Sequence, residues 1–203
     1  MFLKVLKIIC WPIFKLLWRY KVTYEAPLPE DGPVVLAGKH ISGLDPILLT
    51  QTYNRPIRFM AKAELFKIPV LNLLIKAFGA FPVHRGESDV NALKVSIKIL
   101  REGKVLGIMP EGHRVSSIEN LTLKSGAMNL AAKTKATLVP FGLYTKDYKM
   151  KIFRKFEIRY GRPIPFEEYA PSGITKEQID ELTHTLLKNE IVRLSEKDYK
   201  AGR

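Results

Sequence analysis

The sequence predicts an α/β fold in which a largely parallel or mixed sheet is covered by helices on both faces. Short, continuously apolar runs of strand length alternate along the chain with longer segments of helical periodicity. Continuous apolar strands are typical of parallel sheets that are buried on both faces. The chain has 203 residues, of which 46% are hydrophobic and 26% charged. This length and balance are ordinary for one globular domain with a substantial core.

The predicted elements follow a loop at residues 27–33, which is rich in proline. We expect strands at Val34–Gly38, Ala80–Val83, Val105–Met109, Thr137–Leu143 and Lys151–Tyr160. We expect helices at Pro46–Tyr53, Glu64–Phe78, Asp89–Arg101, Lys124–Lys133 and Lys176–Glu196. Ligands of such sheets bind beyond the carboxyl ends of the strands. The residues that follow each strand are therefore the candidates for a functional site.

The first twenty residues are apolar with scattered cations and are predicted to form an amphipathic helix on a membrane surface. Their longest uncharged run, Ile8–Phe14, is much shorter than the about 20 residues that a spanning helix needs. Trp11 and Trp18 fall among the cations, where their rings suit the headgroup level. On a helix the cations occupy about a third of the circumference. They are Lys4, Lys7, Lys15 and Arg19.

We therefore divide the chain into a helical membrane-docking segment, residues 1–26, and an α/β domain, residues 27–203. An ordinary packed helix with a solvated cationic edge is the alternative for the first segment. A signal peptide is disfavoured because cations stand at positions 15 and 19 and a small-residue cleavage site is missing.

The charge of the whole chain indicates an anionic partner. Lys and Arg number 33 against 20 Asp and Glu, a net charge of +13. Nucleic acid, an anionic membrane and phosphorylated substrates all fit this excess. Cys10 is the one cysteine, which excludes an intramolecular disulfide and a metal site built from several thiolates.

His40 and Asp45 follow the first predicted strand and can form a general-base pair. Histidine titrates near neutrality and can take a proton from an alcohol. A carboxylate on its second ring nitrogen fixes the tautomer and stabilises the imidazolium. The pair can meet if Ser42-Gly43 forms a turn. The alternatives are that His40 is a core histidine and that Asp45, before Pro46, caps a helix.

No protein nucleophile is evident beside this pair, since Ser42 is assigned to the turn and Cys10 lies in the N-terminal segment, and no GxSxG turn is present. The substrate would then supply the hydroxyl and the protein only the base, so that transfer is direct.

Arginines follow the next two predicted strands in loops that contain glycine. Arg85 precedes Gly86, and Arg114 follows Gly112. The guanidinium fork matches phosphate oxygens, and glycine opens backbone amides to close approach. Glu111 can pair with an arginine and hold its fork, or can act as a second general base. Ordinary surface arginines are the alternative.

A metal site of three histidines is the remaining chemical alternative. His84 and His113 would have to join His40. Their strings lack the close ligand spacing of metal-binding helices, so we expect no metal and no cofactor.

Taken together, these strings resemble the 1-acylglycerol-3-phosphate acyltransferase family. Its asparagine-histidine-x-x-x-x-aspartate block looks like residues 39–45, and its glycine-hydrophobic stretch closing on arginine looks like residues 79–85. Its phenylalanine-proline-glutamate-glycine-threonine-arginine block is similar to residues 109–114, and its valine-proline pair to residues 139–140. Residues 61–65 look like its lysine segment and residues 123–127 like its lysine-x-glycine-alanine helix start. The resemblance covers about Val34 to Gly142.

The resemblance implies an αβα sandwich with His40 as base and Asp45 orienting it. It implies that Lys62, Arg85 and Arg114 lie near a substrate phosphate. It also implies an acyl thioester donor, on coenzyme A or acyl carrier protein, and no metal. The sequence departs from the family at Lys39 for asparagine, His113 for threonine and Val115 for serine. These departures bear on the identity of the acceptor.

The resulting prediction is acyl transfer to the sn-2 hydroxyl of lysophosphatidic acid at the cytoplasmic face of the cell membrane, by a peripheral or monotopic enzyme. Another lysophospholipid or glycerol 3-phosphate is the alternative acceptor. A nucleic-acid-binding module would need exposed aromatics interleaved with its cations. A non-catalytic membrane adaptor, with a structural His40, is a further alternative.

Overall fold

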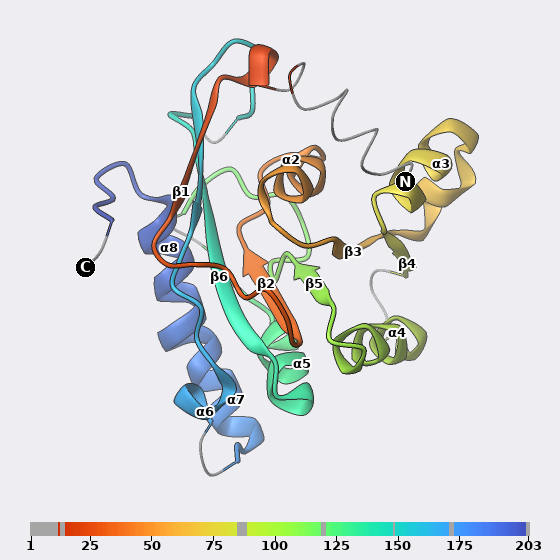
Figure 1. The fold of residues 1–203 in the computed structure, drawn as a ribbon, viewed down its shortest axis with the longest axis vertical. Coiled ribbons are helices and arrows are strands. Elements are labelled where there is room, and N and C mark those ends of the chain that lie inside the picture. Colours follow the sequence, from red (N-terminus) through yellow and green to blue (C-terminus); the bar gives the residue numbers. More distant parts are fainter. Residues whose placement is uncertain are drawn as a thin grey trace.

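The computed structural model describes residue 12 and residues 15–84, 89–118, 121–147, 149–170 and 173–201. Its centre is a seven-stranded sheet in the order β1-β7-β6-β2-β5-β3-β4 (Figure 1). The pairing of β6 with β7 is antiparallel and the other pairings are parallel, so β1 and β7 run against the other five strands. The strands are β1 Tyr20–Tyr24, β2 Val34–Gly38, β3 Ile57–Lys62, β4 Phe81–Val83, β5 Val105–Ile108, β6 Thr137–Tyr144 and β7 Phe156–Tyr160.

Helices lie on both faces of this sheet. They are α2 Asp45–Thr52, the 3₁₀ turn η1 Ala63–Lys67, α3 Pro69–Ala77, α4 Val90–Arg101, α5 Gly126–Thr134, α6 Phe166–Tyr169, α7 Lys176–Leu182 and α8 Lys188–Ser195. A π-helical stretch, η2 Thr183–Leu187, joins the last two. The predicted αβα sandwich with a mixed sheet is therefore confirmed.

Strand β2 shows how the sheet divides the core. Successive side chains of a strand point to opposite faces. Val35 and Ala37 lie in the core cluster that also holds residues of α4, α5 and α7. Val34 and Leu36 lie in a second cluster, with Leu48 and Leu49 of α2. All five residues of β2 are buried, as expected for a central strand. His40 comes two residues after this strand, so the base predicted from the sequence lies at the end of a fully buried central strand.

The predicted N-terminal segment differs from the structure where it can be compared. Residue 12 and residues 15–18 are helical, whereas residues 20–24 form β1, so the prediction of helix is wrong there. Trp18 packs against the second core cluster. Residues 1–11, with Lys4, Lys7 and Trp11, lie outside the described residues. Within the described part of the chain, no helix is long and apolar enough to cross a membrane.

Three predicted elements have other boundaries, for local reasons. The predicted helix 64–78 is interrupted because Pro69 disfavours helical backbone at Ile68, which is extended (φ −88°, ψ 113°). The predicted helix 124–133 begins later, at Gly126. The predicted strand 151–160 is formed only from Phe156 onward. Strand β3 was not predicted.

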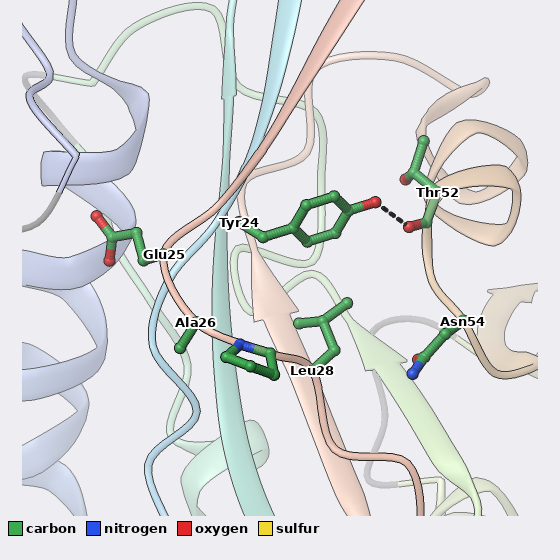
Figure 2. Close-up of a pocket in the computed structure, with 7 residues that line it drawn as sticks. Tyr24, Glu25, Ala26, Leu28, Thr52 and Asn54 are labelled. Atoms are coloured by element: carbon green, nitrogen blue, oxygen red, sulfur yellow. Dashed lines mark hydrogen bonds between the residues drawn. The ribbon is translucent and has the colours of Figure 1, made fainter.

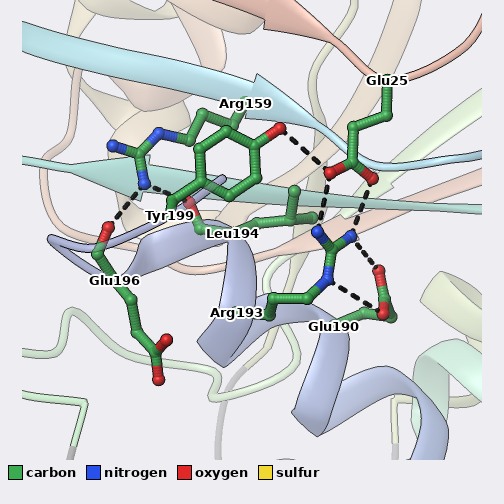
Figure 3. A network of polar contacts seen from close by, with 7 residues as sticks. All are labelled: Glu25, Arg159, Glu190, Arg193, Leu194, Glu196 and Tyr199. Atoms are coloured by element: carbon green, nitrogen blue, oxygen red, sulfur yellow. Dashed lines mark hydrogen bonds and ion pairs between the residues drawn. The ribbon is translucent and has the colours of Figure 1, made fainter. Parts of the chain in front are cut away.

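An ion-pair network joins the end of β1 to α8 (Figure 3). Both guanidinium Nη atoms of Arg193 donate to the carboxylate of Glu25, each at 2.7 Å. Arg193 also pairs with Glu190, and the Tyr199 hydroxyl donates to Glu25 at 3.0 Å. Two parallel bonds of this kind fix orientation as well as distance. The network therefore holds the edge strand β1 against the C-terminal helix.

Candidate active site

His40 and Asp45 meet at the carboxyl end of β2. The Nδ1 atom of His40 lies 2.8 Å from Oδ2 of Asp45. Asp45 is fully buried, whereas the His40 side chain is 14% exposed. Because Asp45 occupies Nδ1, Nε2 is the ring nitrogen that remains to exchange a proton with a substrate. This is the arrangement that a general base and its orienting carboxylate need.

The loop between them is closed by the same carboxylate oxygen. The backbone N–H groups of Ile41 and Ser42 donate to Oδ2 of Asp45 at 2.7 and 2.8 Å. The Asp45 N–H in turn donates to the carbonyl of Ser42 at 3.1 Å, which forms the predicted turn. The carboxylate therefore holds the backbone on which His40 stands as well as its ring.

The interpretation of Asp45 as a helix cap is wrong. Leu44 is the N-cap of α2, and no side chain caps this helix. Asp45 is the first helical residue, and its carboxylate turns back toward Ile41 and Ser42 instead of toward the amides of the first helical turn.

Glu111, in the loop after β5, supports the backbone of His40. Its Oε1 accepts the His40 N–H at 3.3 Å, and the Val115 N–H of the same loop donates to the His40 carbonyl at 2.8 Å. The Glu111 side chain is buried. Among the described residues, no ion pair joins this carboxylate to an arginine. The carboxylate holds the base in place from the neighbouring strand.

Burial raises the pKa of Glu111 to about 7, while the hydrogen bond from His40 and the charge of Lys39 act in the opposite direction. Lys39 is itself fully buried. Burial lowers the pKa of Lys39 to about 8, against the attraction of Glu111 and Asp45. A cation and two carboxylates therefore lie behind the His40 loop. The sequence marked Lys39 only as a departure from the family, because a lysine at a strand end ordinarily reaches solvent.

Glu111→Gln is expected to change how stability depends on pH. The folded pKa of Glu111, about 7, lies above its ordinary value of 4.5, so the folded state binds this proton more tightly than the unfolded chain. The stability that the protonated Glu111 carboxyl contributes is thus fully present below pH 4.5 and is lost as pH rises through about 7. The glutamine variant lacks this loss. Its free energy of unfolding should rise relative to the parent by roughly 3 kcal/mol across that window.

Urea unfolding at pH 5 and pH 8 measures this difference. Glu181→Gln on α7, where the side chain is exposed, is the matched control for removing a carboxylate. A parallel pH dependence in Glu111→Gln and the parent would contradict the prediction.

The loop that carries Glu111 also carries Gly112 and Arg114, for which the sequence predicts contact with a phosphate. Gly112 has φ +73°, a conformation that glycine adopts without strain. Arg114 is exposed in this loop. A side-chain carbon at Gly112 would lie 3.7 Å from Nζ of Lys124. Lys124 is therefore a further cation at this loop. Its motif was noticed in the sequence, but a role for it was missed because only the fold brings residue 124 next to residue 112.

Of the remaining predicted residues, Lys62 and His113 can be placed in the structure. Lys62 ends β3, two strands from β2, and pairs with Glu64 at 3.3 Å. Arg85 lies outside the described residues. His113 lies against the Glu111 carbonyl, 2.9 Å away through Nδ1. Among the described residues, no three side chains of His, Cys, Asp or Glu gather as a metal site would require.

A second histidine-aspartate pair, His84 and Asp89, has the same spacing as His40 and Asp45 but a different environment. His84 lies 3.2 Å from Asp89, but its side chain is 76% exposed. The other oxygen of Asp89 accepts the Ala92 N–H at 2.9 Å, which caps α4. This pair thus carries the helix-capping role that Asp45 lacks, and its ring is solvated. Burial of the histidine ring and the helix-capping role of the carboxylate distinguish the two pairs.

A cavity among the described residues lies elsewhere. It has a volume of about 510 Å³ and is lined by the end of β1 and the end of α2 (Figure 2). Tyr24, whose hydroxyl donates to the Thr52 carbonyl, crosses it. Because β1 runs against β2 and α2 begins at His40's edge, this cavity is at the opposite edge of the sheet. It is not part of the His40 site.

Comparison with known proteins identifies the family of this chain. The family model described as Acyltransferase matches residues 19–144. A 1-acyl-sn-glycerol-3-phosphate acyltransferase of Bacillus subtilis is 34% identical over 82% of this chain and 83% of its own length. One of Borreliella burgdorferi is 33% identical over 62% of this chain and 51% of its own length.

A solved structure has the same fold. The 1-acyl-sn-glycerophosphate acyltransferase PlsC of Thermotoga maritima superposes with a TM-score of 0.68 at 22% identity, over 95% of this chain and 79% of that one. The family model covers more than half of the sequence and includes both His40 and Glu111. The chain is therefore an enzyme that belongs to the acyltransferase family.

Proposed function

We propose that this enzyme transfers a fatty acyl group from a thioester to the sn-2 hydroxyl of 1-acyl-sn-glycerol 3-phosphate and so forms phosphatidic acid. The observation that carries the proposal is the buried Asp45 carboxylate on Nδ1 of His40, which leaves Nε2 for a substrate hydroxyl. The names of the relatives support the acceptor.

In the proposed reaction the acceptor hydroxyl gives its proton to Nε2 of His40 as its oxygen attacks the thioester carbonyl. The tetrahedral intermediate then collapses, the carbon–sulfur bond breaks, and the thiolate leaves. The imidazolium returns the proton to the departing sulfur, so His40 ends as it began. Asp45 stabilises the transient imidazolium and keeps the correct tautomer. The step needs no acyl-enzyme and no metal.

The acceptor phosphate is proposed to bind over the loop that follows β5. Arg114 would supply a planar fork for two phosphate oxygens, and the open backbone at Gly112 permits close approach. Lys124, beside Gly112, would add a point charge. Lys62, at the end of β3, and Arg85, which follows β4 in the sequence, are proposed to be further cations around the phosphate. Placing the phosphate here would leave the glycerol hydroxyl to reach the neighbouring His40.

The acceptor is a bilayer lipid, so we propose that the enzyme works at the cytoplasmic face of the cell membrane as a peripheral or monotopic protein. Residues 1–20 would be one contact with the anionic surface, through the cations named above and the apolar side chains between them. We propose no nucleic-acid partner. Helix formation at residue 12 and residues 15–18 supports this segment, and the packing of Trp18 sets where it meets the domain.

The direct test uses labelled lysophosphatidic acid with acyl-coenzyme A and, separately, acyl carrier protein thioesters. Labelled phosphatidic acid should form with at least one donor, and a phospholipase specific for the sn-2 ester should release the transferred chain. Faster acylation of glycerol 3-phosphate, or of a lysophospholipid with a larger headgroup, would replace the proposed acceptor. Failure of every acceptor with both donors would contradict the proposed function.

A further inference from the structure

The connection between β6 and β7 carries an unusual concentration of charge. We call residues 145–155 the hairpin tip. It contains five cations and one acid: Lys146, Lys149, Lys151, Arg154, Lys155 and Asp147. The five cations and one acid give the tip a net charge of +4. Lys151 pairs with Asp147 at 2.5 Å. A solvated loop needs no such excess, whereas an anionic surface would attract it.

Two large apolar side chains project from this cationic tip. Ile152 is 53% exposed and Phe153 is 67% exposed. Single exposed apolar residues are common on protein surfaces, but adjacent ones ringed by cations are typical of a surface that meets lipid. Leu16 of the N-terminal helical turn is 71% exposed as well. The apolar exposure is therefore shared by two neighbouring segments.

The backbone holds Phe153 in this position at some cost. Its φ is +62°, a conformation that aromatic residues rarely adopt. The Phe153 N–H donates to the carbonyl of Leu17 at 2.6 Å, and Met150 packs against the second core cluster. Strained backbone that is fixed by contacts with the surrounding structure is often found at functional sites. The tip is thus fastened to the N-terminal helical turn, and the two lie side by side at the top of Figure 1.

The topology places the tip at the edge that carries His40. Strand β6 is parallel to β2, with Phe141 opposite Gly38, so both strands end at the same edge. The tip follows Tyr144 and extends beyond that edge. Strand β1 runs the other way and therefore begins there, directly after the N-terminal helical turn. Both segments thus lie on the side from which a bilayer lipid would approach His40.

We propose that the hairpin tip docks into an anionic bilayer, with Ile152 and Phe153 entering the headgroup region and the surrounding cations contacting lipid phosphates. This inference rests on the proposed function in one respect, the bilayer location of the acceptor. The tip makes a second contact beside residues 1–20. Two contacts restrict the tilt of the domain on the membrane, which one helix cannot do. The carboxyl edge of the sheet, with its base, then faces the lipid.

The first experiment measures partition of the full-length protein onto vesicles of phosphatidylcholine with and without phosphatidylglycerol. Ile152→Ser with Phe153→Ser should weaken binding to both vesicles at least about tenfold, because salt-independent apolar burial is lost. Leu93→Ser with Val95→Ser removes comparably exposed apolar side chains, 44% and 40%, from α4 and should leave binding unchanged. Equal binding of the tip variant and the parent would overturn the proposal.

A second variant and its matched control test the electrostatic contribution to vesicle binding. Lys149→Gln with Lys155→Gln should weaken binding to anionic vesicles roughly 30-fold at low ionic strength, and little to neutral ones. Lys133→Gln with Lys176→Gln makes the same change in net charge on α5 and α7 and should have a much smaller effect. Equal losses in the two variants would show that only total charge matters and would overturn the tip's role.

A third measurement tests how deeply the hairpin tip enters the bilayer. A bimane label at Ile152→Cys, in a Cys10→Ser background, should be quenched by nitroxide lipids when the protein is vesicle-bound. The same label at Val95→Cys should not be. A solvated label at both positions would overturn the proposal. Acylation of a short-chain, water-soluble lysophosphatidic acid, measured in parallel, reports on the proposed function separately, because that reaction does not need the tip.

Discussion

His40→Ala is expected to lower turnover by about 10²–10⁴-fold, the usual effect of losing a general base. The loss should fall on turnover because the variant removes a group that acts on the hydroxyl proton. The fold should survive. The two bonds that hold residue 40 to the Glu111 loop use its backbone N–H and carbonyl, which alanine retains. Asp45 also keeps the amides of Ile41 and Ser42 as donors.

The chain offers a matched control for this experiment. His84→Ala removes the histidine of the other pair with the same spacing, in which the ring is solvated and Asp89 caps α4. It should leave turnover close to that of the parent. Steady-state acyl transfer and urea unfolding should be measured on both variants. A folded His40→Ala protein with near-normal turnover would make His40 a structural residue and remove the proposed mechanism.

Arg114→Ala is expected to reduce catalytic efficiency with lysophosphatidic acid by roughly 10- to 150-fold, because a charge-assisted hydrogen bond contributes about 1.5–3 kcal/mol. Arg114 is exposed in the loop that also holds the His40 backbone, which is why it is proposed to contact the phosphate. Its removal leaves Glu111 and the base in place. The loss should therefore appear in acceptor binding more than in the chemical step.

Comparing acceptors with and without a phosphate tests whether Arg114 binds that phosphate. A monoacylglycerol lacks the phosphate, so its acylation should fall much less in Arg114→Ala than that of lysophosphatidic acid. Arg101→Ala, at the far end of α4, serves as the control for removing an exposed arginine. Equal losses with both acceptors would assign Arg114 a structural role and move the phosphate elsewhere along the edge.

The fold was predictable wherever one pattern dominated. Continuous apolar runs indicated β2, β5 and β6, since both of their faces are buried. Strand β1 was mistaken for helix because it is an edge strand, half-exposed and preceded by cations that suit an interfacial helix. Strand β3 was missed because Arg58 interrupts its apolar run. Gly79 leaves room for that side chain, since a carbon there would lie 2.6 Å from Nη1 of Arg58.

The site was predictable in its residues but not in its contacts. The spacing of His40 and Asp45 suggested that they meet, and they do. The same spacing occurs at His84 and Asp89, so spacing alone does not tell a buried pair from a solvated one. The role of Glu111 in holding the His40 backbone depends on which strands are neighbours. Local sequence does not reveal that β5 lies beside β2, and so it also hid the burial of Lys39.

The loop from Gly38 to Asp45 has a consequence for heat inactivation. One carboxylate oxygen gathers two backbone amides and the His40 ring, between a strand and a helix whose Leu48 and Leu49 are fully buried. Regions with such burial open only with the whole domain, whereas loosely held lids open locally. The position of His40 is thus fixed by the same contacts that hold the folded core together. Activity should consequently persist on warming until the domain itself melts, with no milder temperature at which a folded but idle enzyme accumulates.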